Sequence, residues 1–198
     1  MRYNYPIEQA IRAASVLHKD QVCKGPVPYP YITHVFAVAM IVADYTDDEN
    51  CIVSALLHDT LIDTDYTEQE LEDDFGGTIK DIVISITEMY HNEHDTKQRE
   101  KMEKDFLKQL KIAHERALIV LAADKIHTMR SIVENYIEDL SGYIAHYGSH
   151  HEKGLYIYQE ISNALNRRLR NAILTEFNNV FREYKKFIHA VKEKSEQY

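Results

Sequence analysis

The stretch SALLHDTLID, residues 54–63, places an adjacent histidine and aspartate, His58 and Asp59, at the end of an apolar run. Apolar residues at helical spacing before the pair predict a buried helix. Burial of an imidazole and a carboxylate costs several kcal/mol unless both groups are satisfied. A metal ion would satisfy them, and so would a lysine near Asp59 together with a backbone carbonyl near His58. An isolated His-Asp dipeptide favours the second interpretation.

Two further polar side chains change that balance. His34 opens the apolar helix predicted for THVFAVAMIV, and Asp124 interrupts the apolar run ALIVLAADKI. Two imidazoles and two carboxylates form a mixed nitrogen and oxygen ligand set, which suits Mn, Fe, Zn, Co or Mg. Such a set leaves coordination positions open, as a hydrolytic metal requires. The sequence therefore predicts a metal site formed by His34, His58, Asp59 and Asp124 between central helices.

Asp63 is the candidate catalytic residue beside this site. It lies four residues after Asp59, so the two carboxylates share one helix face. In that position Asp63 can accept a proton from an attacking water, as a general base does. The alternative is that Asp63, together with Asp65, only starts the polar loop DTDY.

Candidate substrate-binding residues flank the same site. Thr128 lies one turn after Asp124, and Ser131 lies one turn further along. Both hydroxyls can reach the pocket, although each also suits an exposed helix surface. Lys24 and Lys125 would offset the charge of a phosphorylated substrate.

The periodicity predicts an all-α protein, with helix after helix and no convincing pair of strands. We expect a single domain over residues 1–198 with its core at about 6–165. Helices at about 166–192 would pack on that core or on a partner subunit, which makes a homo-oligomer possible. Gly25 and three prolines make 21–32 irregular, and a loop is predicted at 142–148.

Local signals place several helix boundaries. Thr46 with Glu49, and Thr67 with Glu70, have the spacing of capping boxes. The charged span HNEHDTKQREKMEKD, residues 91–105, is predicted to cover the rim of the site or to form a solvated helix.

The composition sets limits on function. The chain has 198 residues, of which 44% are hydrophobic and 28% charged, and its net charge is −9. A negative net charge argues against nucleic-acid binding, which requires a basic face. The apolar stretch at 35–43 is much shorter than the roughly 20 residues that span a membrane. With a polar N-terminal sequence and only Cys23 and Cys51 as thiols, we expect a cytoplasmic protein without a membrane segment.

The order of the candidate ligands resembles that of the HD-domain phosphohydrolases. The segments YPYITHVFAVAMIVAD, SALLHDTLIDTD, YTEQELEDDFG and LAADKIHTMRSI are similar to the alarmone (ppGpp) hydrolase domains of RelA/SpoT homologues and their stand-alone small relatives. The resemblance runs from about residue 10 to residue 130. It implies an all-α HD fold, a manganese ion, and removal of pyrophosphate from the 3′ position of a guanine nucleotide.

Three positions depart from the pattern of that family. The family signature HDxxED has a Glu where this chain has Ile62, and its Arg-Lys pair corresponds here to Cys23 and Lys24. Its ADxxHN motif ends in an Asn that is replaced here by Thr128. Loss of the Glu would cost on the order of 10²-fold if that residue transfers a proton. Cysteine cannot replace an arginine that stacks on a base.

These departures leave three functional interpretations. The first is a metal-dependent phosphohydrolase that retains the metal chemistry but acts on a different phosphorylated small molecule, a nucleotide. Within this enzymatic interpretation, the alternatives are a true alarmone hydrolase and a nucleotidase or phosphatase. Ile62 favours a catalytically silent regulatory domain that binds a metal or a nucleotide, and a purely structural domain would bind no metal at all.

Overall fold

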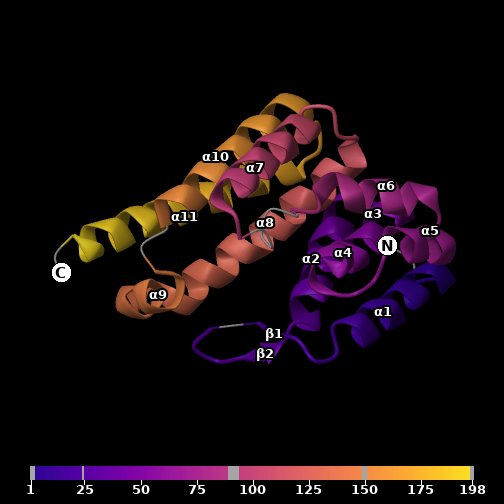
Figure 1. Cartoon of the computed structure of the whole chain (residues 1–198), viewed down its shortest axis with the longest axis horizontal. Helices are drawn as coiled ribbons and strands as arrows, with labels where there is room; N and C mark the ends of the chain where they lie inside the picture. Colours follow the sequence, from indigo (N-terminus) through magenta and orange to yellow (C-terminus); the bar gives the residue numbers. More distant parts are fainter. Residues whose placement is uncertain (1–2, 24, 89–93, 149–150, 197–198) are drawn as a thin grey trace.

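The computed structural model describes residues 3–23, 25–88, 94–148 and 151–196, and the chain in these ranges is almost entirely helical (Figure 1). The all-α prediction is therefore confirmed. The helices are α1 (Tyr5–Leu17), α2 (Ile32–Tyr45), α3 (Glu49–Leu57), α4 (Thr60–Asp63), α5 (Glu68–Phe75), α6 (Gly77–Ile86), α7 (Thr96–Leu110), α8 (Glu115–Tyr136), α9 (Leu140–Tyr147), α10 (His151–Arg168) and α11 (Ile173–Ser195).

Helix α8 forms the centre of the fold. After its first two residues, α8 is apolar on every side as far as Ala123, and the residues from Ala117 to Asp124 are all buried. A helix without a polar face must be covered all round. Helices α2, α3 and α6 pack on one side of α8, and α11 packs on the other side. Figure 1 shows α8 running between the N-terminal helices and the group formed by α7, α10 and α11.

The segment that carries the His-Asp pair is a break between two helices. Helix α3 ends at Leu57, and the single turn of α4 begins at Thr60. The hydroxyl of Thr60 donates a hydrogen bond to the carbonyl of Leu57 at 2.7 Å, which satisfies one free carbonyl at the end of α3. His58 and Asp59 therefore lie at a helix junction, where backbone and side chains can turn toward α2 and α8.

The expectation of no strand pair is wrong in one place. Strands β1 (Val22–Cys23) and β2 (Tyr29–Pro30) form a small antiparallel hairpin within the irregular stretch, with Cys23 opposite Tyr29. Each strand has only two residues, so neither can show the alternation by which strands are recognised in a sequence. Pro30 is tolerated because a two-stranded hairpin has only edge strands.

The loop predicted at 142–148 is also wrong, since α9 occupies most of it. Asp139 caps this helix by accepting a hydrogen bond from the backbone of Gly142 at 2.8 Å. Gly142 lies in the first turn, where a side chain would collide with the Asp139 carboxylate. Gly148, with φ of +69°, ends the helix. The prediction takes both glycines as helix breakers, whereas only Gly148 acts as one.

One of the two predicted capping boxes is present. Thr67 and Glu70 exchange both hydrogen bonds at the start of α5, as predicted. Helix α3 begins at Glu49, but its cap is Asp48, whose carboxylate accepts a hydrogen bond from the backbone of Asn50 at 3.0 Å. Thr46 instead accepts a hydrogen bond from the backbone of Asp48 at 3.1 Å.

The C-terminal helices lie against the rest of the chain. Helix α11 buries one apolar face, which contacts α8, α9 and α10 and includes Phe177, Phe181 and Phe187. This packing accounts for the apolar periodicity at about 166–192, while the oligomeric state remains a prediction. No helix in the described ranges is both long enough and apolar enough to cross a membrane.

Candidate metal centre

Three separate elements bring the four predicted ligands together. His34 lies in the first turn of α2, His58 and Asp59 lie at the junction of α3 and α4, and Asp124 lies within α8. The Nε2 atom of His34 is 3.3 Å from Nε2 of His58, 3.4 Å from Oδ1 of Asp124 and 3.6 Å from Oδ2 of Asp59. The Nε2 atom of His58 is 2.9 Å from Oδ2 of Asp59. All four ligand groups thus face one small volume.

The outer nitrogen of each histidine is occupied by a partner. The Nδ1 atom of His58 lies 2.8 Å from the carbonyl oxygen of Ala55, so it carries the proton, because a carbonyl only accepts. The Nδ1 atom of His34 lies 2.8 Å from Nδ1 of His127. Burial, and then the charge of His34, lowers the pKa of His127 to about 4, so His127 is neutral and can accept. Both Nε2 atoms then face the carboxylates, which is the orientation of metal-ligating imidazoles.

Electrostatics keeps both carboxylates ionised. Burial opposes ionisation, yet His58 and His34 hold the pKa of Asp59 well below its usual range. For Asp124, Lys125 and the two histidines likewise outweigh burial and lower the pKa. Burial also lowers the pKa of His34, but hydrogen bonds with Asp124 and Asp59 raise it overall, to about 9.

The donor set fits a divalent cation. His34, His58 and Asp59 each offer one ligand atom, and these atoms all lie within 4.8 Å of one another. Asp124 adds a second carboxylate within reach of both imidazoles. Ionised carboxylates facing two imidazole nitrogens, with little access to water, require a compensating positive charge. Protons on the histidines or a divalent metal can supply that charge.

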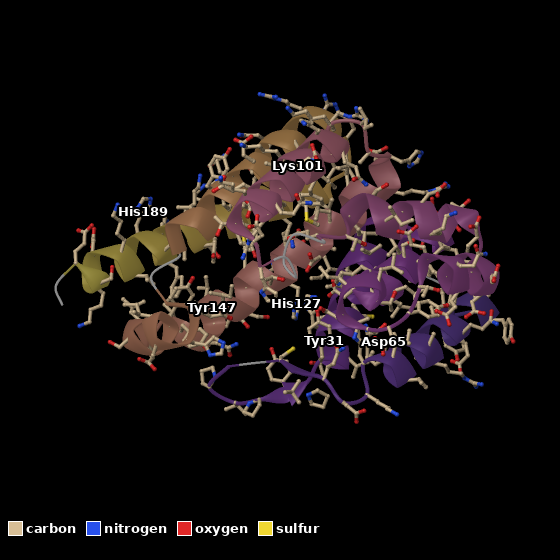
Figure 2. All side chains as sticks on the ribbon, viewed as in Figure 1. Tyr31, Asp65, Lys101, His127, Tyr147 and His189 are labelled. Carbon is tan, nitrogen blue, oxygen red and sulfur yellow. The ribbon has the colours of Figure 1, made fainter. Side chains whose placement is uncertain are left out.

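Two hydroxyl groups hold the carboxylates in place. The hydroxyl of Tyr31 donates a hydrogen bond to Oδ2 of Asp59. The hydroxyl of Thr128 donates to Oδ1 of Asp124 at 3.2 Å. The substrate contact predicted for Thr128 stays a prediction, because the residue lines the cavity while its hydroxyl bonds to a candidate metal ligand. Figure 2 labels Tyr31 and His127, whose rings both lie beside the ring of His34.

Lys125 is held by two carboxylates. Its Nζ atom is 2.7 Å from Oε1 of Glu88 and 2.9 Å from Oδ2 of Asp124, and all three side chains are largely buried. The ammonium group also lies 6.0 Å from the centre of the Tyr158 ring. Lys125 therefore fixes the orientation of Asp124 and neutralises Glu88, and little of its charge remains for a substrate.

A cavity of about 460 Å³ opens from the metal centre. Its far end is formed by the β1–β2 hairpin, by α9 and by one face of α8. On that face Ser131 and Asn135 follow Thr128 at intervals of three and four residues, and all three line the cavity. Tyr29 of β2 and Tyr147 of α9 also line this end of the cavity, and Figure 2 labels Tyr147. The cavity thus joins a charged end to an aromatic and amide-lined end.

Asp63 lies at the rim between the metal centre and solvent. It lines the cavity, as does Tyr31, whose hydroxyl donates a hydrogen bond to Asp59. Partial burial, and then the negative charge of Asp59, raises the pKa of Asp63. A carboxylate with a raised pKa is a stronger base, which is the property that general-base catalysis needs. Ile62, at the position where the family resemblance predicts a Glu, gives this rim an apolar surface.

Among the other predicted residues, Ser131 lines the cavity and Lys24 lies outside the described residues. The prediction missed Tyr31, His127 and Glu88. His127 follows Asp124 by three residues on the same face of α8, so its position carried a usable signal. Tyr31 and Glu88 come from a turn and from the residues after α6, where no periodicity points to them.

No residue of α7 is among the described residues that line the cavity, so the expected cover of its rim is not provided by that helix.

Comparison with known proteins supports the interpretation of this geometry. The family model of the HD domain matches residues 10–165. A guanosine-3′,5′-bis(diphosphate) 3′-pyrophosphohydrolase MESH1 of Xenopus tropicalis is 35% identical over 130 residues, which cover 64% of this chain and 69% of that protein. A guanosine-3′,5′-bis(diphosphate) 3′-pyrophosphohydrolase of Haemophilus influenzae is 35% identical over 104 residues, or 52% of this chain.

The extent of these matches differs. The chain spans only 15% of the Haemophilus protein, so it corresponds to one part of that longer relative. A solved structure described as a metazoan ortholog of SpoT that hydrolyzes ppGpp superposes with a TM-score of 0.72 at 22% identity. That superposition covers 92% of this chain and 97% of the other, which shows that the two share a fold.

Proposed function

The chain belongs to the HD-domain family, and on that premise we propose that it is a metal-dependent phosphohydrolase acting on a phosphorylated small molecule, a nucleotide. The observation that carries the proposal is the convergence of His34, His58, Asp59 and Asp124 at one end of a cavity of about 460 Å³. We propose these four side chains as ligands of a divalent metal, with manganese as the first candidate.

The reaction would use the residues around that centre in distinct roles. The chemistry supplied by a bound divalent ion is Lewis-acid polarisation of the phosphoryl group. Asp63 accepts the proton of the attacking water, a role that its raised pKa and its position at the rim support. Tyr31 holds Asp59, and Lys125 holds Asp124, so the ligands are oriented before substrate binds.

The opposite end of the cavity suits a nucleoside. Tyr29 and Tyr147 provide aromatic surface for a base, and Ser131 and Asn135 provide a hydroxyl and an amide for hydrogen bonds. Side chains of this kind, placed beside an apolar wall, fix the orientation of a bound small molecule. A nucleotide lying along α8 would place its phosphate at the metal centre.

Charge favours a nucleotide with fewer phosphates than guanosine bis(diphosphate). Among the described residues that line the cavity are four carboxylates, and Lys125 is the one lysine or arginine. The formal charge of these five groups is therefore −3, and a divalent metal would leave −1. We therefore name two candidate activities. Alarmone hydrolysis is the first, because the names of the relatives suggest it. A nucleotidase that releases phosphate from a single phosphate group is the second, because the charge of the cavity favours it.

A substrate panel tests the proposal. The protein is loaded with manganese and incubated with ppGpp and with nucleoside monophosphates. Release of pyrophosphate would identify an alarmone hydrolase, and release of phosphate would identify a nucleotidase. Binding of nucleotides by calorimetry without any turnover would instead support the silent regulatory domain that Ile62 favours. Protein that retains no metal after exposure to each candidate ion would contradict both enzymatic assignments.

Asp63→Asn tests the catalytic assignment. Removal of the base is expected to lower kcat by about 10²-fold or more, while the metal content measured by elemental analysis stays unchanged. Asp65→Asn is the matched control, because Asp65 is an exposed carboxylate two residues away that does not line the cavity. Equal turnover in the Asp63→Asn variant and the control would remove Asp63 from the mechanism.

A further inference from the structure

A second cavity, remote from the metal centre, lies between α7 and α10. Its volume is about 450 Å³, close to that of the first, and the two cavities share no lining residue. Leu107 and Ala164 give it an apolar floor. The remaining walls are polar, and five of the side chains that form them are basic: Lys104, Lys108, Lys111, Arg167 and Arg168.

Four lysines of α7 and of the residue that ends it follow the period of the helix. Lys101, Lys104, Lys108 and Lys111 are separated by three, four and three residues, so they form one stripe along a single face. Figure 2 labels Lys101 on this helix. Lys104, Lys108 and Lys111 of that stripe line the cavity. Arg167 and Arg168 approach the same space from the last turn of α10, so two helices converge on one basic groove.

Few negative charges balance this groove. Among the described residues that line it, Glu160 is the one acidic residue, and it accepts a hydrogen bond from Asn163 at 3.0 Å. Lys108 pairs with Asp105 of its own helix. Within the described part of the chain, Lys104, Lys111 and Arg167 have no carboxylate partner within 4.0 Å. The groove lining is therefore net positive in a protein whose net charge is −9.

Helix termini alone do not explain the arrangement. Cations are favoured near helix C-termini, which accounts for Lys108, Arg167 and Arg168 individually. Lys104, however, lies six residues before the end of α7 at Leu110, beyond the reach of that effect. Arg168 has a structural task, because its guanidinium group donates to the carbonyls of Lys111 and Ala113 at 2.5 and 3.1 Å. It fixes the chain between α7 and α8 and so keeps the groove in shape.

We propose that this groove binds a small molecule that carries two or more phosphate groups. Positive charges repeated about every 5.4 Å along a helix match charges repeated along one ligand better than they match a single anion. Guanidinium and ammonium groups are the usual partners of phosphate oxygens. The apolar floor at Leu107 and Ala164 would contact the base or another carbon-rich part of the ligand. The site is independent of the phosphohydrolase activity proposed above.

Calorimetric titration with inorganic tripolyphosphate tests the proposal. The protein is first freed of divalent metal with a chelator, so that the metal centre cannot hold phosphate through an ion. Saturable binding of one tripolyphosphate per chain is expected. The double variant Lys104→Gln/Arg167→Gln should weaken it by about tenfold or more, because two charge-assisted contacts are lost. The matched control Arg182→Gln/Lys186→Gln removes one arginine and one lysine from exposed positions of α11 and should bind as the wild type does.

Three results would overturn the proposal. One is the absence of saturable binding to the wild-type protein. Another is equal weakening in both double variants, which would show that the net charge of the chain, rather than the groove, attracts the anion. The third is displacement of tripolyphosphate by a hexaglutamate peptide at equal concentration, which would identify the groove as a docking surface for acidic polypeptides. Circular dichroism of both double variants confirms that each remains folded.

Discussion

Tyr31 is not a candidate ligand, but its hydroxyl group contacts the metal centre. It donates to Oδ2 of Asp59, one of the four proposed ligand groups. Removing such a partner from a ligand typically weakens metal binding by about 10–100-fold, because the carboxylate is no longer held in position. We expect Tyr31→Phe to have this effect, measured by competition with a fluorescent chelator.

A suitable control for Tyr31→Phe is Tyr5→Phe, since Tyr5 is 71% exposed on α1. This variant should bind metal with wild-type affinity. If the two variants have the same affinity, Tyr31 has no part in orienting Asp59.

Metal affinity should also depend on pH through His34. Hydrogen bonds with Asp124 and Asp59 overcome the effect of burial and raise the pKa of metal-free His34 to about 9. Below that pH the ring is protonated, and a metal must displace the proton to reach Nε2. Affinity should therefore rise between pH 6 and 8, by about tenfold per pH unit for each proton released.

Calorimetry in two buffers of different ionisation enthalpy would count the released protons directly. Burial lowers the pKa of His58, but Asp59 and Asp124 raise it overall. This ring can therefore contribute a second proton. An affinity that does not change over this pH range would contradict the assignment of both histidines as ligands.

At the residue scale, the candidate ligands were visible in the sequence because each is a polar group where burial demands an apolar one. Asp124 is the clearest case, since it follows seven apolar residues of α8. Tyr31 and Glu88 gave no such signal, because neither interrupts an apolar pattern. The hydrogen-bond partner of Thr128 could not be predicted either, because helical spacing shows which face a hydroxyl lies on but not which atom it bonds.

At the scale of elements, two adjacent glycines provide a matched pair for a stability test. Gly76 separates α5 from α6 with φ of +84° and ψ of +161°, a conformation open almost only to glycine. Gly77 begins α6 with ordinary helical geometry. Gly76→Ala should lower the free energy of unfolding by about 1–3 kcal/mol through backbone strain.

Gly77→Ala should leave the free energy of unfolding unchanged or slightly raised, since alanine favours a helix and its Cβ would make only an ordinary contact with Glu72. Urea denaturation followed by circular dichroism measures both variants. Similar stabilities for the two would show that the turn between α5 and α6 can relax without cost.

The elements that could be predicted are those with long apolar periods. Helices α2, α8 and α11 each have at least three turns of regular spacing, and their burial follows from it. The β1–β2 hairpin and α9 could not be predicted with the same means. The hairpin is held by two pairs of residues, and α9 depends on the capping contact of Asp139, which overrides the weak helix propensity of Gly142.

At the scale of the whole molecule, the site is a product of long-range packing. The proposed ligands are 90 residues apart in the chain, from His34 to Asp124, and helix packing around α8 brings them within 3.4 Å. Sequence periodicity predicts that each helix is buried, but it does not specify which helices are neighbours. The aromatic end of the cavity, built from the hairpin and α9, was unpredictable for the same reason.

Because the ligands join α2, the α3–α4 junction and α8, metal binding should stabilise the whole fold. A ligand that binds only the native state at about 100 times its Kd adds about 2.7 kcal/mol to the free energy of unfolding. For a chain of this size, that corresponds to a rise in Tm of roughly 5–10 °C on metal addition.

In His58→Ala, one imidazole is missing, so the difference in Tm between metal-loaded and chelator-treated protein should nearly vanish. Asp65→Asn should keep the full difference, because Asp65 is exposed and is not among the proposed ligands. Differential scanning calorimetry of all three proteins, each with and without manganese, measures this. The comparison is made within each protein, so any loss of stability caused by the substitution itself cancels. A Tm shift in His58→Ala as large as in the wild type would place the stabilising metal elsewhere in the molecule.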